Sequence, residues 1–233
     1  MLEKELLLEK DLFFFLNGSE FGFLDYFFWL YSYKLTWVPF YLCFILVFIY
    51  NYKKNWKEIL LVLLSIGLVI LLCDQISSGF FKPVFQRFRP THHPDFQDQV
   101  STVLGYRGGR YGFISSHAAN AFGFATFTAL IFKKRLFTIT IMLFAIINGY
   151  SRIYLGVHFI SDIIAGALVG AICAYLVYML YNLCKVRFLN YNKEELKLSP
   201  YTNKQVYFLC GAYCLTILLI LTLDNQLISY LNN

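Results

Sequence analysis

Three short polar clusters interrupt an otherwise apolar chain, and their side chains are of the kinds that bind and transfer a phosphoryl group. The clusters occupy residues 82–90 (KPVFQRFRP), 115–117 (SSH) and 151–162 (SRIYLGVHFISD). They supply a lysine, arginines, serines, two histidines and an aspartate. Cationic side chains bind phosphate oxygens, and an imidazole lone pair can act as a nucleophile. The three clusters together therefore predict a site that holds a phosphoryl group and transfers it to a histidine.

The third cluster places a carboxylate four residues after a histidine. On a helix, residues i and i+4 share a face, so Asp162 can accept the Nδ1 proton of His158 and leave Nε2 as a free lone pair. Arg152 precedes His158 by six residues and can reach the same pocket if the chain turns between two helices. Its guanidinium binds phosphate in a fork. Taken singly, these residues also fit a structural His–Asp pair and an arginine extending to lipid headgroups.

The second cluster lies directly before an apolar run that begins at Ala118. Ser115, Ser116 and His117 should form the first turn of that helix, where unpaired backbone N–H groups favour anions. The hydroxyl of Ser115 adds a donor, although serine is also an ordinary helix cap. His117 can protonate a leaving oxygen, because the ordinary pKa of histidine lies near neutrality.

The first cluster carries two cations seven residues apart, Lys82 and Arg89, with Pro83 limiting further helix between them. Both can fold toward one anion, and the alternative is an ordinary basic patch beside the membrane. Arg87 has the same charge in a less compelling place. In the following loop, Arg107 and Arg110 bracket two glycines, a flexible basic turn suited to a second anionic group.

The elements that must position these clusters are membrane helices. The 233 residues are 58% hydrophobic and 15% charged, with a mean hydropathy of +0.57, so the chain is predicted to be all-α. We expect a polytopic bundle of about six transmembrane helices, in one domain over residues 1–233. The expected spans are 36–52, 57–81, 114–132, 136–150, 158–184 and 205–230. Residues 22–34 are interfacial, re-entrant or part of a first crossing, and the N-terminus predicts an amphipathic helix on the membrane surface, with Glu9 facing water.

Charge and cysteine placement exclude other classes. The net charge of +6 comes mostly from basic residues that flank apolar runs, so no nucleic-acid partner is expected. The six cysteines lie in or beside apolar segments without Cys/His metal spacing, and neither a metal nor another cofactor is expected.

Basic residues also orient the spans. Three groups, at 53–57, 133–135 and 185–204, fall on one side when six crossings alternate, and the positive-inside rule makes that side cytoplasmic. The three polar clusters then lie together on the outer side. The expected location is a bacterial inner membrane, with the site facing the periplasm.

The spacing Lys82-x6-Arg89-Pro90, Ser115-x-His117 and Ser151-Arg152-x5-His158-x3-Asp162 resembles the three-part signature of the type 2 phosphatidic acid phosphatase (PAP2) family. Vanadium-dependent haloperoxidases share that site, but they are soluble, which disfavours them here. The core of the resemblance spans about 57–185. One departure is Ile114-Ser115-Ser116-His117, where the family usually reads Pro-Ser-Gly-His. The Cβ of Ser116 narrows the approach to phosphate, and we expect a shift in substrate preference rather than loss of activity.

The resemblance implies a role for each residue. His158 is the expected nucleophile that forms a phosphohistidine, Asp162 orients it, and His117 is the acid for the leaving group and then the base for water. The residues expected to bind the phosphoryl oxygens are Lys82, Arg89, Ser115, Ser116 and Arg152. The scheme needs no metal.

These observations predict an integral membrane lipid phosphatase, with a lipid phosphomonoester or diphosphate as the partner in the bilayer. Lipid A and undecaprenyl diphosphate are favoured, and phosphatidylglycerophosphate and phosphatidic acid are the alternatives. A transporter for anions or lipids would place its charges near the midplane and show paired repeats. A catalytically inactive scaffold would not need the complete set of His117, His158 and Asp162.

Overall fold

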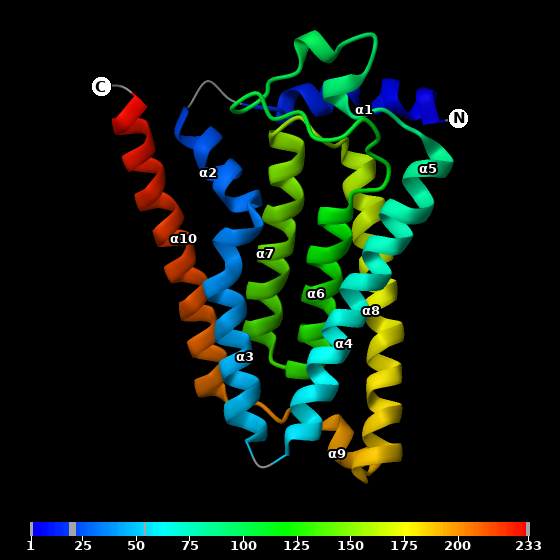
Figure 1. Ribbon diagram of the computed structural model, residues 1–233, viewed down its shortest axis with the longest axis vertical. Coiled ribbons are helices and arrows are strands. Elements are labelled where there is room, and N and C mark those ends of the chain that lie inside the picture. The colour runs from blue at the N-terminus through cyan, green and yellow to red at the C-terminus, as the bar shows by residue number, and fades with distance from the viewer. Residues whose placement is uncertain (1, 19–21, 54, 232–233) are drawn as a thin grey trace.

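Long apolar helices stand side by side and make up the body of the molecule (Figure 1). The computed structural model describes residues 2–18, 22–53 and 55–231, and the side chains of residues 9–18, 22–53 and 55–223. Within this part of the chain there is no β-strand, only an isolated bridge between Phe88 and Tyr111. The predicted all-α membrane fold is therefore confirmed.

The helices follow one another with short connections, apart from one long loop between α5 and α6. Their bounds are α1 (Leu2–Leu16), α2 (Gly22–Ser32), η1 (Lys34–Trp37), α3 (Val38–Tyr52), α4 (Trp56–Asp74), η2 (Gln75–Phe81), α5 (Lys82–Phe85), η3 (Pro90–His92), η4 (Gln97–Gln99), α6 (Ser116–Phe132), α7 (Arg135–Tyr154), α8 (Ile160–Leu189), α9 (Lys193–Lys197) and α10 (Asn203–Leu231). Here η2 is a π-helix, and the other η elements are 3-10 helices.

Five helical segments in the described part are long and apolar enough to cross a membrane: Lys34–Tyr52, Trp56–Phe85, Arg135–Tyr154, Ile160–Leu189 and Asn203–Leu223. The sixth predicted span, 114–132, is the shorter helix α6 of 17 residues, which packs among α4, α7 and α8. The segment predicted at 22–34 forms α2 and the start of η1, which lead into α3 (Figure 1). The candidate span Lys34–Tyr52 begins at the end of this segment and does not include α2.

Two of the predicted boundaries differ at the site. Helix α7 continues to Tyr154, past the predicted end at 150, and α8 begins at Ile160 rather than at 158. Arg152 consequently lies in the last turn of α7, and His158 lies in the turn before α8 instead of on the helix itself. This turn, residues 155–159, is called the catalytic turn below.

Glycines let α6 and α8 approach closely at the end that carries the polar clusters. A Cβ at Gly166 would lie 2.6 Å from the carbonyl oxygen of Ser115, and one at Gly170 would lie 2.3 Å from that of Ala119. Their spacing of four residues is the small-residue pattern of close helix pairs in membranes. The contact brings the start of α6 beside the start of α8, where the N–H of Ser115 donates to the carbonyl oxygen of Asp162 at 3.0 Å.

Apolar side chains cover the outer faces of the long helices, as a lipid solvent requires. On α4 the exposed residues include Leu60, Leu64 and Leu71, and on α8 they include Leu168 and Ile172. The interior is aromatic. Phe132, for example, stacks on the ring of Tyr201 at 3.9 Å between centroids.

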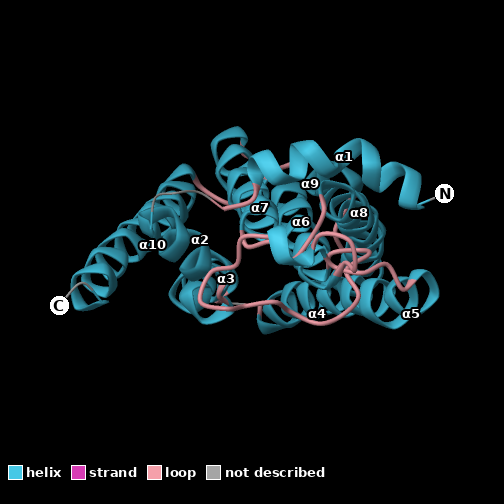
Figure 2. Ribbon diagram, turned by 90° about the horizontal axis from the view of Figure 1, so that it is seen from above, coloured by secondary structure: helices cyan, strands magenta, loops and turns pink. Residues whose placement is uncertain are grey.

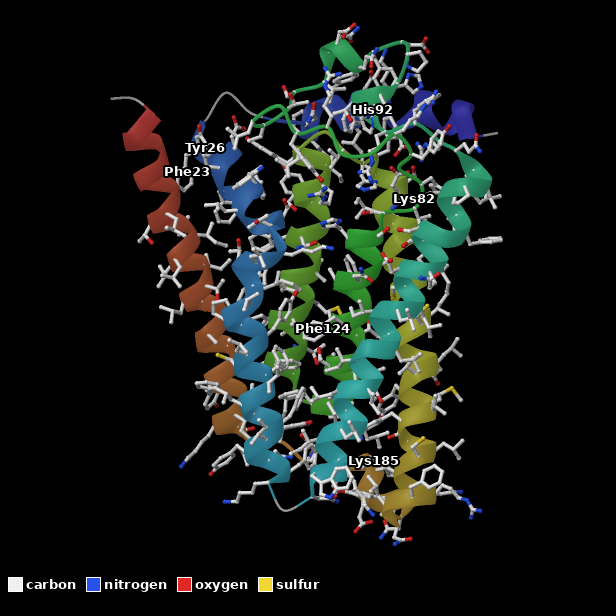
Figure 3. All side chains as sticks on the ribbon, in the orientation of Figure 1. Phe23, Tyr26, Lys82, His92, Phe124 and Lys185 are labelled. Atoms are coloured by element: carbon white, nitrogen blue, oxygen red, sulfur yellow. The ribbon has the colours of Figure 1, made fainter. Side chains whose placement is uncertain are left out.

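The two ends of the bundle differ in charge and shape. The α3–α4, α6–α7 and α8–α9 connections, with their basic residues, lie at one end, and Lys185 marks that end in Figure 3. Lys82, His92 and the long loop lie at the opposite end with α1 (Figure 3). Seen from above, α1 runs along one edge of the bundle (Figure 2), in contact with α7 and α8. The structure thus confirms that the basic groups and the polar clusters lie at opposite ends; Lys54 lies outside the described residues.

Candidate active site

The catalytic turn holds a histidine against a carboxylate. Nδ1 of His158 lies 3.2 Å from Oδ2 of Asp162, and both side chains are buried. The same oxygen accepts the N–H of Phe159 at 3.0 Å, which fixes the carboxylate in the first turn of α8. The predicted pair therefore forms, although His158 makes it from the turn rather than from the helix face. Because the Nδ1–H of His158 donates to Asp162, the lone pair of the neutral imidazole is on Nε2.

Arg89 contacts that lone pair. Its Nη1 donates to Nε2 of His158 at 2.9 Å and to the carbonyl oxygen of Val157 at 2.9 Å. Glycines make room for the side chain, since a Cβ at Gly108 would lie 3.2 Å from Nη1 and one at Gly112 would lie 3.2 Å from its Cγ. Gly112 also approaches the carboxylate, where a Cβ would lie 3.0 Å from Oδ2 of Asp162.

Arg152 is buried at the end of α7 with little to neutralise it. The residue is 2% exposed, and Nη2 donates to the hydroxyl of Tyr106 at 3.1 Å. Its Nε, like that of Arg89, is buried without a hydrogen-bond partner. Among the described residues, neither arginine forms an ion pair with a carboxylate. Buried charges of this kind call for an anion.

Lys82 is tied to the start of α6. Its Nζ donates to Oγ of Ser116 at 2.7 Å and to Oγ of Ser78 at 3.3 Å. Ser77 also donates to Oγ of Ser116, at 2.9 Å. Both serines come from η2, a π-helical segment of the kind often found at functional sites. The hydroxyl of Ser116 therefore points toward η2 and Lys82.

Ser115 and His117 occupy the first turn of α6 as predicted. Ser115 is the N-cap, and its Oγ accepts the N–H of Ala118 at 3.3 Å. His117 lines a cavity of about 560 Å³ together with Lys82, Arg89 and Ser116. It makes no hydrogen bond with another described residue, so both of its ring nitrogens can serve a ligand.

The cavity extends from these polar residues into the apolar interior. Its lining continues from Trp37 at the end of η1 along α3 to Phe48, along α4 from Asp74 to Leu63, and to Phe124 halfway down the bundle (Figure 3). Trp37 and Phe48 are eleven positions apart, a helical rise of roughly 16 Å. Lys34 of η1 also lines it, a cation that sequence patterns did not single out.

Burial and neighbouring charges shift the pKa values of His158 in the turn and Arg89 in the loop. Burial lowers the pKa of His158 well below its ordinary value, and the positive charges of Arg89 and Arg152 lower it further. Burial also lowers the pKa of Arg89, which lies near Arg152. The free site therefore presents a neutral imidazole under concentrated positive charge.

Two residues that the sequence did not predict at the site, Arg87 and Glu9, are part of it. Arg87 donates from Nη1 to Oδ1 of Asp162 at 3.0 Å, although its position seemed less compelling than that of Arg89. Glu9 pairs with Arg87, so the expectation that it faces water is wrong. No motif spacing links residues 9 and 87, and only the docking of α1 brings them together.

Arg107 and Arg110 lie at the same end of the molecule but outside the cavity lining. Both are exposed, and the guanidinium of Arg110 lies over the rings of Phe88 and Tyr111 at 5.1 Å and 5.6 Å. Their contact with a headgroup stays a prediction. Among the described residues, no group of three or more His, Cys, Asp or Glu side chains is placed to hold a metal ion.

Known proteins resemble this chain over most of its length. The profile of the PAP2 superfamily matches residues 58–185. A lipid A 4'-phosphatase of Porphyromonas gingivalis is 50% identical over 188 residues, which cover 81% of this chain and 79% of that protein. A lipid A 4'-phosphatase of Bacteroides thetaiotaomicron is 38% identical over 174 residues, 74% of this chain and 76% of that protein.

Solved structures share the fold. The crystal structure of Aquifex aeolicus LpxE matches with a TM-score of 0.54 and 28% identity, over 74% of this chain and 95% of that one. The transmembrane PAP2-type phosphatidylglycerolphosphate phosphatase of Bacillus subtilis matches with a TM-score of 0.51 and 26% identity, over 71% and 79% of the two chains.

Proposed function

Since this chain belongs to the PAP2 superfamily, we propose that it is a lipid A phosphatase of a bacterial inner membrane, acting through a phosphohistidine and without a metal. The observation that carries the proposal is the pair of buried arginines, Arg89 and Arg152, neither of which forms an ion pair with a described carboxylate. Nη1 of Arg89 donates to the lone pair of His158, and the charge of Arg152 also acts on that ring. A phosphate group supplies the anion that these guanidiniums lack.

Binding begins with an exchange of partners at Arg89. An arriving phosphate accepts the N–H groups of Arg89 and Arg152, including the two Nε donors that are unpaired in the free site. Arg89 thereby releases Nε2 of His158, which then faces the phosphorus atom. Lys82 of α5, whose Nζ reaches Ser116, and the donors of Ser115 and Ser116 at the start of α6 bind the remaining oxygens.

In the first step, the lone pair of Nε2 attacks phosphorus and a P–N bond forms. The bond from phosphorus to the lipid oxygen breaks, and that oxygen takes a proton from His117, which is protonated once the negative charge of the bound phosphate offsets the surrounding cations. Asp162 stabilises the imidazolium-like ring through Nδ1. The cations around the phosphoryl group stabilise the charge on its equatorial oxygens.

In the second step, water attacks phosphorus while neutral His117 takes its proton. The P–N bond breaks, its electron pair returns to Nε2, and inorganic phosphate leaves. His117 is then protonated again and His158 is neutral, as the cycle requires. Both histidines flank the same polar end of the cavity, His117 in its lining and His158 behind Arg89.

The cavity and the relatives support the choice of lipid. An apolar cavity that continues into the bundle from the cations suits an amphiphile whose headgroup enters the site and whose acyl chain stays in the interior. Lys34 lines the cavity with His117 and has no ion-pair partner in the described part of the chain, so it can meet a second anionic group. Lipid A carries such a group, and the two relatives with the highest identities quoted above are lipid A 4'-phosphatases.

Orientation follows from the charges at the two ends. The basic groups at the α3–α4, α6–α7 and α8–α9 connections mark the cytoplasmic side by the positive-inside rule. We therefore propose that the active site faces the periplasm.

The test is phosphate release by the purified protein in detergent from lipid A, undecaprenyl diphosphate, phosphatidylglycerophosphate and phosphatidic acid. We expect release from lipid A in the presence of EDTA, with loss of the 4'-phosphate in the product's mass spectrum, and no release by His158→Ala. Loss of activity in EDTA that a divalent ion restores would contradict the metal-free scheme. Full activity of His158→Ala would contradict the nucleophile.

A second substrate has specific support. The structurally similar Bacillus subtilis protein is a phosphatidylglycerolphosphate phosphatase, and a curated phosphatidylglycerophosphatase B of the same organism is 26% identical over 135 residues. Faster release from phosphatidylglycerophosphate than from lipid A would assign that function instead.

A further inference from the structure

We propose that Glu9, on the N-terminal helix α1, is a positioning residue for this reaction: it fixes Arg87, and Arg87 fixes the carboxylate that orients His158. The inference rests on the proposed function of the site. Glu9 lies outside residues 58–185, the part of the chain that matches the family profile. Its role therefore follows from how this chain folds its N-terminus onto the site.

Arg87 bridges two carboxylates on opposite sides of its guanidinium. Nη1 donates to Oδ1 of Asp162 at 3.0 Å, and Nη2 forms a short ion pair with Oε1 of Glu9. The Arg87 side chain is 3% exposed and lies over the ring of Phe159 at 4.7 Å. A guanidinium held at both ends has a fixed plane, which a single contact does not provide.

The two oxygens of Asp162 thereby have separate tasks. Oδ1 receives Arg87, and Oδ2 receives Nδ1 of His158 and the N–H of Phe159. If Arg87 loses its second anchor, its guanidinium can tilt, and the carboxylate can turn away from Nδ1. The imidazole then loses the orientation that points Nε2 at phosphorus.

Glu9 also accepts two hydrogen bonds from Ser161 in the first turn of α8. Its Oε2 accepts the N–H of Ser161 at 2.9 Å, and its Oε1 accepts the Ser161 hydroxyl at 2.7 Å. Ser161 in turn accepts from Nη1 of Arg87 at 2.6 Å. A carboxylate at a helix start pairs an otherwise unpaired N–H and stabilises the positive end of the helix dipole. Glu9 therefore holds both the arginine and the turn that carries Asp162.

Contacts of Phe13 and Asn17 keep Glu9 in place. Phe13 is fully buried against Phe159, with ring centroids 5.2 Å apart, and Asn17 donates to the carbonyl oxygen of Tyr154 at 2.9 Å. Glu9 and Phe13 are four positions apart and share one face of α1, and Asn17 follows directly after the helix end at Leu16. This face follows the catalytic turn from the end of α7 to the start of α8, along the edge seen in Figure 2.

The primary test compares Glu9→Gln with Asp11→Asn in phosphate release. Asp11 is on the same helix, is exposed and has no ion pair among the described residues, so its variant removes the same charge without touching the site. We expect Glu9→Gln to lower kcat by about ten- to a hundredfold with KM within about twofold of wild type. Asp11→Asn should match wild type. A kcat for Glu9→Gln equal to that of Asp11→Asn would overturn the inference.

Three further variants test whether Glu9 acts on the reaction through Arg87. Arg87→Lys keeps the charge but cannot span both carboxylates, so it should also lower kcat and leave KM unchanged. The double variant Glu9→Gln/Arg87→Met should have the kcat of Arg87→Met alone, because the two residues act as a unit. Additive losses in kcat would show that Glu9 acts independently of Arg87 and would overturn the inference.

Vanadate binding distinguishes failure of this inference from failure of the proposed function, because it needs no lipid. We expect wild type and Asp11→Asn to bind vanadate equally in calorimetry, and Glu9→Gln to bind about tenfold more weakly, since the ion must meet an oriented Nε2. Equal affinity in all three proteins overturns the inference alone. Vanadate binding by wild type without release from any lipid of the panel overturns the proposed function alone.

Discussion

At the scale of single residues, we expect Arg152 to be required for activity and yet to lower the stability of the folded protein. It is 2% exposed, and no described carboxylate neutralises it. We expect Arg152→Met to abolish phosphate release and yet to raise the free energy of unfolding in phosphate-free buffer by about 1–2 kcal/mol, because a buried unpaired charge is replaced by an apolar side chain of similar length. Thermal unfolding in detergent, with and without phosphate, measures this.

The control for this prediction is Arg187→Met, which removes an exposed arginine at the other end of the bundle and should leave stability nearly unchanged. Phosphate should stabilise wild type and Arg187→Met but not Arg152→Met. A lower unfolding temperature for Arg152→Met than for wild type in phosphate-free buffer would contradict the prediction.

The lowered pKa of His158 leads to a second prediction, which concerns how the free energy of unfolding depends on pH. The groups that face its ring are Asp162, Arg89, Arg152, His117 and Lys82, and burial with the cations keeps its pKa well below the ordinary value. The folded protein thus binds fewer protons than the unfolded chain once the pH falls below about 6.5. Its stability should decline there by up to about 1.4 kcal/mol per pH unit and stay level above neutrality.

Unfolding temperatures of wild type and His158→Asn between pH 5 and 8 test this contribution. The stability difference between the two proteins should change only on the acid side, since asparagine does not titrate. Parallel curves over the whole range would show that the pKa of His158 is the same in the folded and unfolded protein, and would contradict the prediction.

The residues that spacing could identify are those whose partners lie close in the sequence. Asp162 follows His158 by four positions, and Ser115 begins an apolar run, so local geometry predicts both contacts. Glu9 and Arg87 are 78 positions apart, and their contact depends on where α1 docks. The hydroxyl of Ser116 accepts from Lys82, which directly follows the π-helix η2, and hydrophobic periodicity does not reveal such a local distortion of a helix.

At the scale of elements, the contact between α6 and α8 sets the distance between Ser115 and Asp162. We expect Gly170→Ala to lower the free energy of unfolding by about 1–3 kcal/mol, because the added methyl group would meet the carbonyl oxygen of Ala119 at 2.3 Å. Chemical unfolding in detergent measures the loss. The matched control is Gly211→Ala on α10, where nothing lies within 4 Å of an added Cβ. Equal stability of the two variants would contradict close packing at Gly170.

Hydropathy predicted which segments become membrane helices, but not how each one ends. Helix α7 continues through Ser151 and Arg152, which are polar but buried in the site. A count of apolar residues does not predict this continuation, because it takes polar residues as the end of a membrane helix. The short α6 lacks the length of a full crossing, yet its central place among α4, α7 and α8 supplies the site with Ser115, Ser116 and His117. The position of α6 is therefore explained by the helices that pack around it rather than by its length.

At the scale of the whole molecule, one end of the bundle concentrates the site and the other concentrates surface cations (Figure 1). The alternation of spans predicted this separation because helices joined by short loops must reverse direction. The fold of the loop between α5 and α6 was not predictable, since it is set by contacts such as the donation from Arg89 N–H to the carbonyl oxygen of Arg110 at 3.0 Å. Those contacts bring Gly108 and Gly112 against Arg89.

The polarity of the two ends predicts the topology in a cell. Gln99 is exposed on the loop at the site end, and Lys193 is exposed on α9 at the basic end. A cysteine placed at Gln99 should react with a membrane-impermeant maleimide in intact spheroplasts, and one placed at Lys193 should react only after lysis, because the basic end stays in the cytoplasm. Wild type is the control, since its own cysteines lie in the long helices and should stay unlabelled. Labelling of Lys193→Cys in intact spheroplasts, with Gln99→Cys protected, would place the active site in the cytoplasm and exclude a periplasmic substrate.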